Sequence, residues 1–391
     1  MGRLALLPLP EPLFAGVTPK LRSFGYLNCA HQAPITFFRT LRQLAICFDE
    51  GLFSSMSAHG HIEIFNNLPL LEKLVIQRAL PSQLRELPSS ESHITATSAD
   101  SSPGFVLPNL KTLYLEDDLR PVHRFLQRLA LPPPGITRDL NVHCYTNPRT
   151  EDVNGVFAAF AQHISMGARG ARISYAHGHP HSRLRMQLFP SSTIPKKSKT
   201  PATQLVIAFA GSPHDPALTP AALAASAHLP LGAVEHVHLE YLHPLQSEQW
   251  ARFLMAFPSL TMLSSSESPS IPLVSALADE ADGIVHTGSI TPVLPLLNRI
   301  TLDRMSLKTV YPCSTSHQPY AIDLRRLVLA RAKRGWPIKE LVLQRVRDAP
   351  QEMRDILDAV ADTIRFQDEC AEVHYCDDFD LGSPLDIDEG A

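Results

Sequence analysis

The sequence predicts a mixed α/β fold in which short parallel strands alternate with helices. One observation is a triplet of aliphatic residues, spaced Leu-x-x-Leu-x-Leu, that returns along the chain, often after a Leu-Pro-x-Leu lead-in. The other is that apolar residues between the triplets recur at the period of one helix face. Strand and helix in repetition predict a leucine-rich-repeat solenoid, with a curved parallel sheet on its concave side and helices on its convex side.

The triplets mark the expected strands. Successive side chains of a strand point to opposite faces, so the triplet residues are expected inside and the residues between them outside. Within each half of the chain the triplets start 20 to 41 residues apart, which predicts ordinary repeats and, in the longer gaps, inserted loops. The six clear triplets and two looser ones are Leu41, Leu44 and Ile46; Leu71, Leu74 and Ile76; Leu110, Leu113 and Leu115; Val234, Val237 and Leu239; Leu297, Ile300 and Leu302; Ile338, Leu341 and Leu343; Leu21, Phe24 and Tyr26; and Leu260 and Leu263.

Five segments between the strands are expected to be helices. Their apolar stripes occupy 122–129, 153–164, 250–257, 324–328 and 353–364. Pro121 suits a first helical turn, Ser247 is the expected N-cap of the third helix, and Gly335 suits the C-terminal cap of the fourth. Two further segments, SRLRMQLF and TQLVIAF, are expected to be strands, but their register is left open.

The expected domain organisation is one repeat domain and a tail. We expect the leucine-rich-repeat domain to span 1–365, with inserted loops at about 84–107 and 190–203. The first loop is rich in Ser and Thr, and the second is basic. From Gln367 to Ala391 the chain has nine acidic residues and no Lys or Arg, so 366–391 is predicted to be an acidic disordered tail.

Composition excludes several classes of protein. A hydrophobic content of 44% and a charged content of 19% are typical of a folded soluble protein. A net charge of −4 disfavours a general role on nucleic acid or at a membrane surface. No apolar run is long enough to span a bilayer, and prolines interrupt the first apolar stretch. Six scattered cysteines favour a reducing compartment, so the expected location is cytoplasmic or nuclear.

Chemical motifs are weak in this chain. His177, His179 and His181 alternate with Gly178 and Pro180, which favours a solvated loop over a zinc site. Cys370, His374 and Cys376 have no matching pair of ligands elsewhere. The chain has no nucleophile elbow, phosphate-binding glycine loop or dinucleotide fingerprint. We therefore expect no catalytic residues, no metal and no cofactor, and a protein that is not an enzyme.

The outward strand residues are the candidate binding residues. Tyr and Arg most often anchor interfaces, so Tyr114 and Arg299 lead the candidates. The alternative is that these side chains are only solvated. The candidates on the concave face are Thr112, Tyr114, Glu116, His236, His238, Glu240, Arg299 and Asp303, and weaker ones are Lys73, Gln77, Thr301, Glu340 and Gln344.

One expected helix is strongly basic. It carries Arg325, Arg326, Arg331, Lys333 and Arg334. These residues could dock an acidic partner or the acidic tail of the same chain. The favoured interpretation is a solvated convex face.

Several segments together resemble the repeat region of fungal F-box/leucine-rich-repeat-like proteins. They are LPLLEKLVI, LPNLKTLYLEDD, WARFLMAFPSLTML, LPLLNRITLDRM and DLRRLVLARAKRGWPIKELVLQRV. In that group a helix with the order Arg, Gly, Pro precedes the next strand, and Arg334, Gly335 and Pro337 match this order. The resemblance covers about residues 12–364 and is strongest in the last third. No F-box is recognisable before the repeats, which begin by Leu21.

The resemblance implies a non-enzymatic interaction scaffold, similar to the substrate-recognition subunit of a cullin-type ubiquitin ligase. Its partners would be a target protein on the concave face and, where the full-length product carries an F-box, the ligase adaptor, with no nucleic acid and no membrane. The alternatives are a free-standing leucine-rich-repeat binding protein unconnected to ubiquitin and, from another class, a regulator of a GTPase.

Overall fold

The computed structural model has a mixed α/β architecture. It describes residues 7–8, 21–30, 39–48, 64–80, 104–130, 139–144, 150–161, 167–176, 183–192, 205–210, 218–240, 242, 245–266, 270–282, 294–307, 320–346, 351–358 and 364–367. The chain divides into two compact units, here called unit 1 and unit 2. Unit 1 holds the described residues from 7 to 161 with Leu205–Ala210, and unit 2 holds those from 167 to 192 and from 218 to 367.

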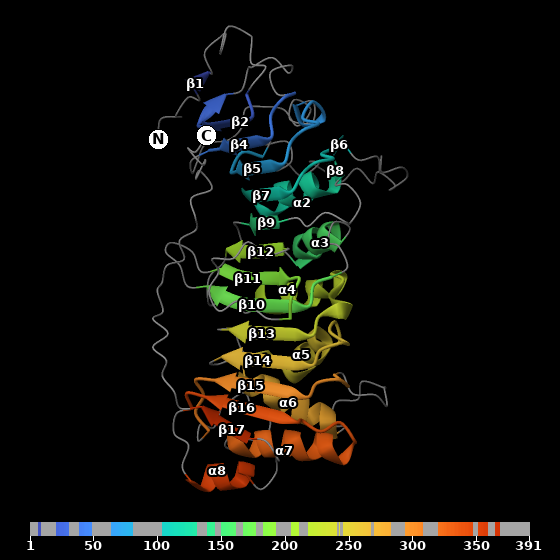
Figure 1. Ribbon diagram of the computed structural model, residues 1–391, viewed down its shortest axis with the longest axis vertical. Helices are drawn as coiled ribbons and strands as arrows, with labels where there is room; N and C mark the ends of the chain where they lie inside the picture. The colour runs from blue at the N-terminus through green and yellow to red at the C-terminus, as the bar shows by residue number, and fades with distance from the viewer. Residues whose placement is uncertain are drawn as a thin grey trace, which may run out of the picture. The chain divides into compact units, whose positions relative to one another are not determined.

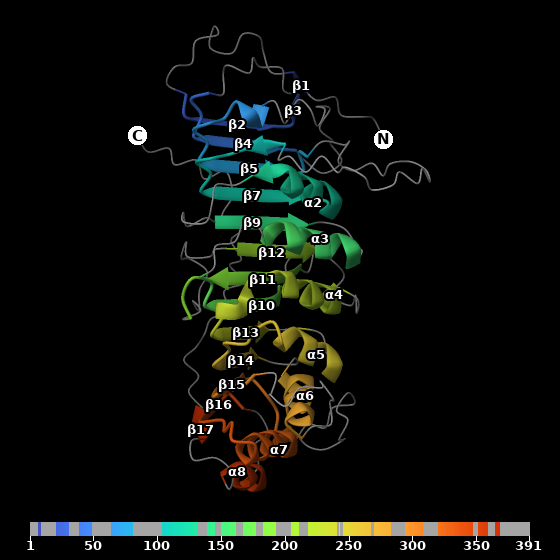
Figure 2. The same cartoon turned by 90° about the vertical axis from the view of Figure 1, so that its right-hand side faces the viewer.

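Unit 1 is built on parallel strands in the order β12-β9-β7-β5-β4-β2. Two short parallel pairs, β1 with β3 and β6 with β8, lie outside this sheet. Figure 2 shows α2 and α3 on one side of the strands. The elements are β1 (Leu7–Pro8), β2 (Ser23–Leu27), β3 (Cys29–Ala30), β4 (Gln43–Cys47), β5 (Lys73–Gln77), β6 (Phe105–Val106), β7 (Thr112–Asp117), α2 (Leu119–Arg128), β8 (Leu129–Ala130), β9 (Asp139–Cys144), α3 (Thr150–Ala161) and β12 (Leu205–Ala210).

Unit 2 has strands in the order β11-β10-β13-β14-β15-β16-β17. The pairing is parallel except between β10 and β11, which are antiparallel. Its helices α4, α5 and α6 lie on one side of the strands (Figure 2). The elements are β10 (Gly170–Ala176), β11 (Arg183–Phe189), α4 (Leu218–Ala225), η4 (Ser226–His228), η5 (Leu231–Ala233), β13 (His236–Glu240), α5 (Ser247–Leu254), β14 (Met262–Ser266), α6 (Ser270–Asp282), β15 (Arg299–Asp303), α7 (Tyr320–Lys333), β16 (Glu340–Gln344), α8 (Gln351–Asp358) and β17 (Ile364–Gln367), as labelled in Figure 1.

All eight triplets are strands, as predicted, and their register is in phase. In unit 2 Val237 pairs with Leu263, which pairs with Ile300, and the ladder continues through Leu341 to Ile364. In unit 1 the equivalent ladder runs from Phe24 through Leu44, Leu74 and Leu113 to Leu140. Leu74, Leu113, Val237 and Leu263 are fully buried, and Leu44, Ile300 and Leu341 nearly so. Apart from the half-buried Leu21 and Phe24, the triplet residues therefore form the core of each unit.

A backbone contact recurs with the same geometry directly before several strands. Thr261 O accepts hydrogen bonds from the N–H groups of Asn298 and Arg299, both at 3.1 Å. Asn298 O in turn accepts from Lys339 at 2.8 Å and Glu340 at 3.1 Å. In unit 1 the equivalent carbonyls that accept two N–H groups belong to Arg22, Arg42 and Glu72. In each of these cases the carbonyl of the residue directly before one strand thus holds the start of the neighbouring strand.

The Leu-Pro-x-Leu lead-in forms a tight turn before the strand. Leu297 N–H donates to Leu294 O at 3.3 Å, and both side chains are buried. Of the two residues between them, Leu296 is 54% exposed. The same turn joins Leu68 to Leu71, Leu107 to Leu110, Leu231 to Val234 and Phe257 to Leu260. The first and last residues of each turn are buried. The core packing therefore determines the side chains at two of the four turn positions.

The residue directly after several strands adopts a left-handed backbone conformation. Asn28, Arg78, Arg304 and Arg345 have φ between 50° and 57°, and they follow β2, β5, β15 and β16. Arg304 N–H donates to Gln344 O at 3.0 Å, so the strand turns away while still bonded to its neighbour. Such a conformation is uncommon for residues other than Gly, Asn and Asp.

The helix predictions are correct in position but not at every boundary. Helices α2, α3, α5, α7 and α8 occupy the predicted segments. Gly335 has φ +85° and ends α7, with Trp336 N–H donating to Arg331 O at 3.0 Å, as expected of a C-terminal cap. The N-cap prediction for Ser247 is wrong, because Gln246 occupies the cap and its N–H donates to the Gln249 side chain at 2.9 Å.

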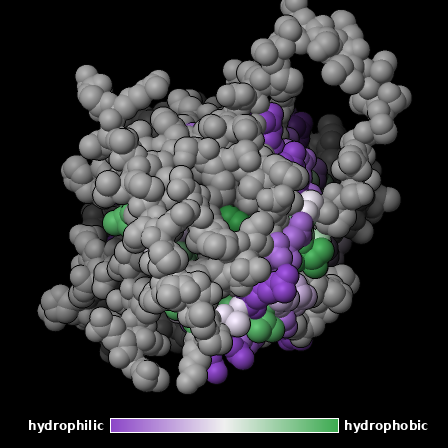
Figure 3. Space-filling model, turned by 90° about the horizontal axis from the view of Figure 1, so that it is seen from above, coloured by the Kyte–Doolittle hydropathy of each residue, from purple (hydrophilic) through white to green (hydrophobic). Residues whose placement is uncertain are grey.

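The last predicted helix is too long. It ends at Asp358, and Ile364 begins β17. Phe105–Val106, at the end of the first predicted inserted loop, form β6. In contrast, Ile164, the histidine loop 177–181 and the residues from 368 onward lie outside the described residues. In Figure 3 the coloured part of the visible face is mainly hydrophilic, with small separate hydrophobic spots.

Candidate functional site

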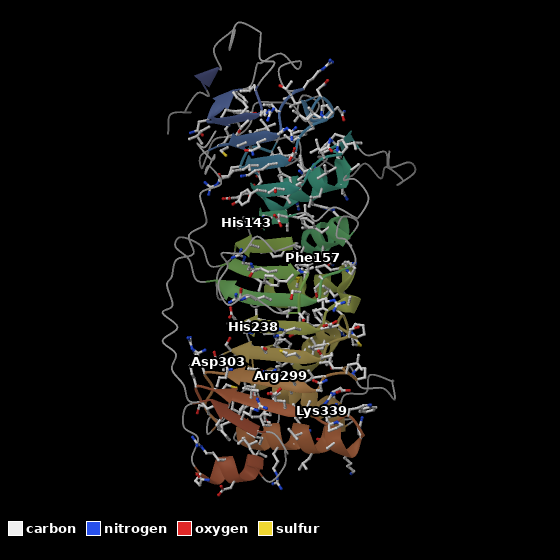
Figure 4. The ribbon with its side chains drawn as sticks, in the orientation of Figure 1. His143, Phe157, His238, Arg299, Asp303 and Lys339 are labelled. Atoms are coloured by element: carbon white, nitrogen blue, oxygen red, sulfur yellow. The ribbon has the colours of Figure 1, made fainter. Side chains whose placement is uncertain are left out.

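Alternate residues of the unit 2 strands form the candidate site. They lie between the buried triplet residues and therefore share the opposite face of the sheet. We call this surface the polar strand face. Figure 4 labels His238, Arg299 and Asp303 along these strands. The polar residues of the polar strand face include Arg172, His236, His238, Glu240, Ser264, Arg299, Thr301, Asp303, Glu340, Gln344 and Arg365, together with Arg345 at the end of β16, and the apolar Met262 and Val342 share this face.

An arginine and a histidine hold one carboxylate at one end of this face. Arg172 donates to both carboxylate oxygens of Glu240, from Nε to Oε2 at 3.1 Å and from Nη2 to Oε1 at 2.8 Å. His238 Nε2 lies 2.6 Å from Oε1 of the same carboxylate. Burial raises the pKa of Glu240, but the His238 hydrogen bond and the Arg172 charge outweigh it and lower the pKa to about 2. Glu240 is therefore ionised, and His238 Nε2 carries the donated hydrogen.

His236 is held by two neighbours. Its Nδ1 lies 2.9 Å from Ser192 O, and its Nε2 lies 2.9 Å from Ser264 Oγ. A carbonyl oxygen only accepts, so Nδ1 must be the donor, and Nε2 can accept from the Ser264 hydroxyl. Burial lowers the pKa of His236, aided by the charges of His238 and Arg299. His236 is thus a neutral ring that ties the end of β11 to β13 and β14.

A second set of ion pairs covers the other end of the face. Arg299 Nε lies 3.3 Å from Glu340 Oε2, and Arg365 Nη1 lies 3.5 Å from Oε1 of the same carboxylate. Arg345 makes a bidentate pair with Asp303 on the neighbouring strand, with Nε to Oδ1 at 2.7 Å. Each pair joins adjacent strands, because β15 pairs with β16 and β16 with β17.

In every one of these pairs the arginine is more exposed than its carboxylate. The exposed fraction of the side chain is 61% for Arg365 and 39% for Arg299, but 23% for Glu340. Arg172 and Arg345 likewise exceed Glu240 and Asp303. Guanidinium groups have five N–H donors, of which a carboxylate uses two. The face therefore presents hydrogen-bond donors and positive charge outward, with its carboxylates beneath.

The predicted site residues divide between the two units. His236, His238, Glu240, Arg299 and Asp303 belong to unit 2 and share the polar strand face. Thr112, Tyr114 and Glu116 lie on β7 of unit 1. The sequence did not indicate this division.

The unit 1 candidates are packed together. The Tyr114 hydroxyl donates to Glu116 Oε2, and the Tyr114 ring lies 5.2 Å from the His143 ring, measured between centroids. Glu116 and His143 are buried, whereas Tyr114 and Thr112 are half-buried. These two contacts hold the Tyr114 side chain in place, and only part of it is exposed to solvent.

Sequence reasoning missed Arg172, Arg345 and Arg365. Arg172 lies on β10, whose segment GARISYA alternates small or aliphatic residues with polar ones but lacks the leucine triplet. This period of two was the available signal. Arg345 follows β16 and folds back over Asp303, and no local pattern predicts that contact. Arg365 directly follows the apolar stripe 353–364, whose spacing predicts a helix, whereas the structure has the strand β17 there.

The basic helix is only partly solvated. Arg331 is buried and donates from Nη2 to Leu294 O at 2.8 Å and Leu297 O at 3.2 Å, so it holds the turn before β15. Arg326 bonds Asp279 at 2.7 Å and also pairs with Asp282, both on α6. Arg325, Lys333 and Arg334 are exposed. The prediction of a solvated face is therefore wrong for Arg331, which packs into the core.

The described residues offer little for catalysis by thiol or metal. Burial raises the pKa of Cys47 to about 11 and also raises the pKa of Cys144, so neither thiol ionises readily. Among the residues the structure describes, no group of three or more His, Cys, Asp and Glu side chains could hold a metal ion. None of the described helices is long and apolar enough to cross a membrane.

Comparison with known proteins adds no assignment. Neither a scan against protein-family models nor a search of curated proteins finds a match to this chain.

Proposed function

We propose that this protein is a non-enzymatic binding scaffold of the leucine-rich-repeat type, whose polar strand face holds a protein partner. The observation that carries the proposal is that four arginines, of which Arg365 is exposed and the other three are half-buried, each exceed the exposure of the carboxylate that they pair with on that face. Arginine is among the residues that most often contribute strongly to protein interfaces. The ion pairs fix the guanidinium groups before binding, which reduces the entropy lost when a partner docks.

The repeat assignment is supported by recurrence at three levels. The triplet recurs in sequence, the strands pair in phase, and before several strands one carbonyl bonds two N–H groups at the start of the next. Repeats of this kind bury their apolar faces against each other and leave the alternate strand residues for binding. The proposal includes the curved arrangement with this face on the concave side.

Within this class we propose the substrate-recognition role that the resemblance to F-box/leucine-rich-repeat-like proteins implies. The partner would then be a protein destined for ubiquitination, and a cullin-ligase adaptor would bind any F-box of the full-length product. The free thiols Cys47 and Cys144 are consistent with action in the reducing cytoplasm or nucleus.

Affinity capture with matched variants tests the proposal. The bait is the full chain, the test variant is Arg299→Gln with Arg365→Gln, and the control is Lys333→Gln with Arg334→Gln at the C-terminal end of α7. We expect proteins retained by the unmodified bait and the control to be lost by at least about tenfold with the test variant. Equal retention by all three baits would refute the polar strand face as the binding surface.

The identity of the captured proteins distinguishes the two binding roles. Recovery of a cullin-ligase adaptor together with a face-dependent target supports the ligase role. A face-dependent target without the adaptor supports a free-standing repeat scaffold. A face-dependent GTPase whose nucleotide hydrolysis the chain accelerates would move the protein to the regulatory class.

A further inference from the structure

We propose that the acidic segment of this same chain, residues 368–391, binds the polar strand face of unit 2. This inference rests on the proposed function, because it names an internal occupant for the same binding surface. A protein partner would then have to displace the acidic segment. The observations that carry it are the outward arginines, the composition of the segment and the place where the segment leaves the sheet.

The charges are complementary. On the polar strand face Arg172, Arg299, Arg345 and Arg365 outnumber and overlie Glu240, Asp303 and Glu340. The acidic segment has nine Asp or Glu residues and no Lys or Arg. Carboxylates accept the N–H groups that the guanidinium groups direct outward, and such charge-assisted bonds are stronger than neutral ones.

The connection places the segment beside the face. β17 pairs with β16 at one end of the sheet, and its last residue, Gln367, directly precedes Asp368. Arg365, the most exposed arginine of the ion pairs, lies three residues before Asp368. The segment therefore starts at the positively charged surface.

The segment is long enough to cross the whole face. Residues 368–391 can span up to about 80 Å at ~3.3 Å per residue. Neighbouring strands are about 4.8 Å apart, so the five steps from β17 to β10 amount to about 24 Å. A tether of this length gives an effective concentration in the millimolar range, so weak contacts suffice for occupancy.

The basic helix α7 is the poorer site for the segment. Arg331 is buried, and the Arg326 guanidinium is already paired with Asp279 and Asp282. Only Arg325, Lys333 and Arg334 of its basic residues are exposed. These residues supply the matched control for the experiment.

The test compares two full-length chains. One is the unmodified protein, and in the other every Asp and Glu of 368–391 is replaced by Asn or Gln. The probe is a fluorescent synthetic peptide of sequence 368–391, and its anisotropy reports binding. We expect the neutralised chain to bind the probe, and the unmodified chain to bind it at least about tenfold more weakly because its own segment competes. Raising NaCl from about 0.05 M to about 0.5 M should weaken the binding.

Two variants in the neutralised chain locate the site. Arg299→Gln with Arg365→Gln should weaken probe binding about tenfold, and the α7 pair Lys333→Gln with Arg334→Gln should leave it unchanged. Arg365→Gln alone, at a highly exposed position, should give a smaller loss and covers the case in which the double variant fails to fold. Circular dichroism checks each fold.

Several results would overturn the inference. They are equal probe binding by both chains, no binding by the neutralised chain, or loss of binding caused by the α7 pair. If these results occur while Arg299→Gln with Arg365→Gln still abolishes capture of a protein partner, the acidic segment is not the occupant and the proposed function stands.

Discussion

Ion pairs on the polar strand face couple single residues to the stability of unit 2. Glu240 accepts from Arg172 and His238, and these contacts lower its pKa from 4.5 to about 2. A carboxylate with a depressed pKa in the folded state stabilises that state above its unfolded pKa. The contribution is lost as the pH falls through the folded pKa.

The first prediction concerns Glu240→Gln. The contribution of the Glu240 charge, about 3 kcal/mol, should be complete above about pH 4.5 and should disappear as the pH approaches 2. The variant lacks a titrating carboxyl there, so its free energy of unfolding should fall less over this range. Urea unfolding at a series of pH values measures the difference. Parallel curves for the two proteins would contradict the assigned contacts.

At the residue scale the sequence predicts side-chain direction but not partners. The period of two placed His236, His238, Glu240, Arg299 and Asp303 on one face, and this is confirmed. It could not predict that Arg172 reaches Glu240, because the two residues are 68 positions apart in the chain. Such pairs depend on strand order, which local patterns do not encode.

At the scale of the element, the turn before each strand separates core from surface within four residues. Leu296 and Leu297 are neighbours in the same Leu-Pro-x-Leu turn, yet Leu296 is largely exposed and Leu297 is buried. The two positions therefore form a matched pair with identical chemistry.

We predict that Leu297→Ala destabilises unit 2 by about 2–5 kcal/mol, because it removes buried methyl groups and leaves a cavity. Leu296→Ala should change the free energy of unfolding by no more than about 0.5 kcal/mol. Chemical denaturation followed by tryptophan fluorescence measures both. Similar losses for the two variants would mean that the turn is not positioned as described.

The elements predicted from the sequence are mainly those in which several apolar residues repeat in phase, and the elements without such a repeat were not predicted. All eight triplet strands, the two strands expected at SRLRMQLF and TQLVIAF (β11 and β12) and five helices were predicted, because each carries several apolar residues in phase. The strands β9 and β10 and the helices α4 and α6 were not, since their buried positions mix Leu with Val, Ala, Ile and Cys and do not repeat the Leu-x-x-Leu-x-Leu triplet. Ile364 was assigned to a helix because it continued the helical spacing, while the four residues of β17 are too few to establish a period of their own.

At the scale of the whole molecule, the division into two compact units bears on how the chain unfolds. The sequence predicts one repeat domain over 1–365, whose repeats continue without a break. Repeat proteins derive their stability from each repeat and its neighbours, so cooperativity can end where neighbouring contacts weaken. Both tryptophans, Trp250 and Trp336, belong to unit 2, and their fluorescence therefore reports that unit.

We predict that the two units unfold in separable transitions. Leu74→Ala in unit 1 should shift a transition seen by circular dichroism and leave the fluorescence transition unchanged. Leu341→Ala in unit 2 should shift the fluorescence transition, and both residues are buried to a similar degree. Denaturation followed by both signals measures this. A fluorescence shift caused by Leu74→Ala would instead favour a single cooperative domain.

The carbonyl that bonds two N–H groups of the following strand bears on how far the connections between strands can vary in length. The register between Lys73 and Thr112 is kept although 38 residues separate them, whereas only 29 separate Gln43 from Lys73. Because alignment is set at the strand entrance, the connecting stretch can grow or shrink without displacing the neighbouring strands. New specificities could thus arise by lengthening such connections while the arginine-bearing ladder stays where it is.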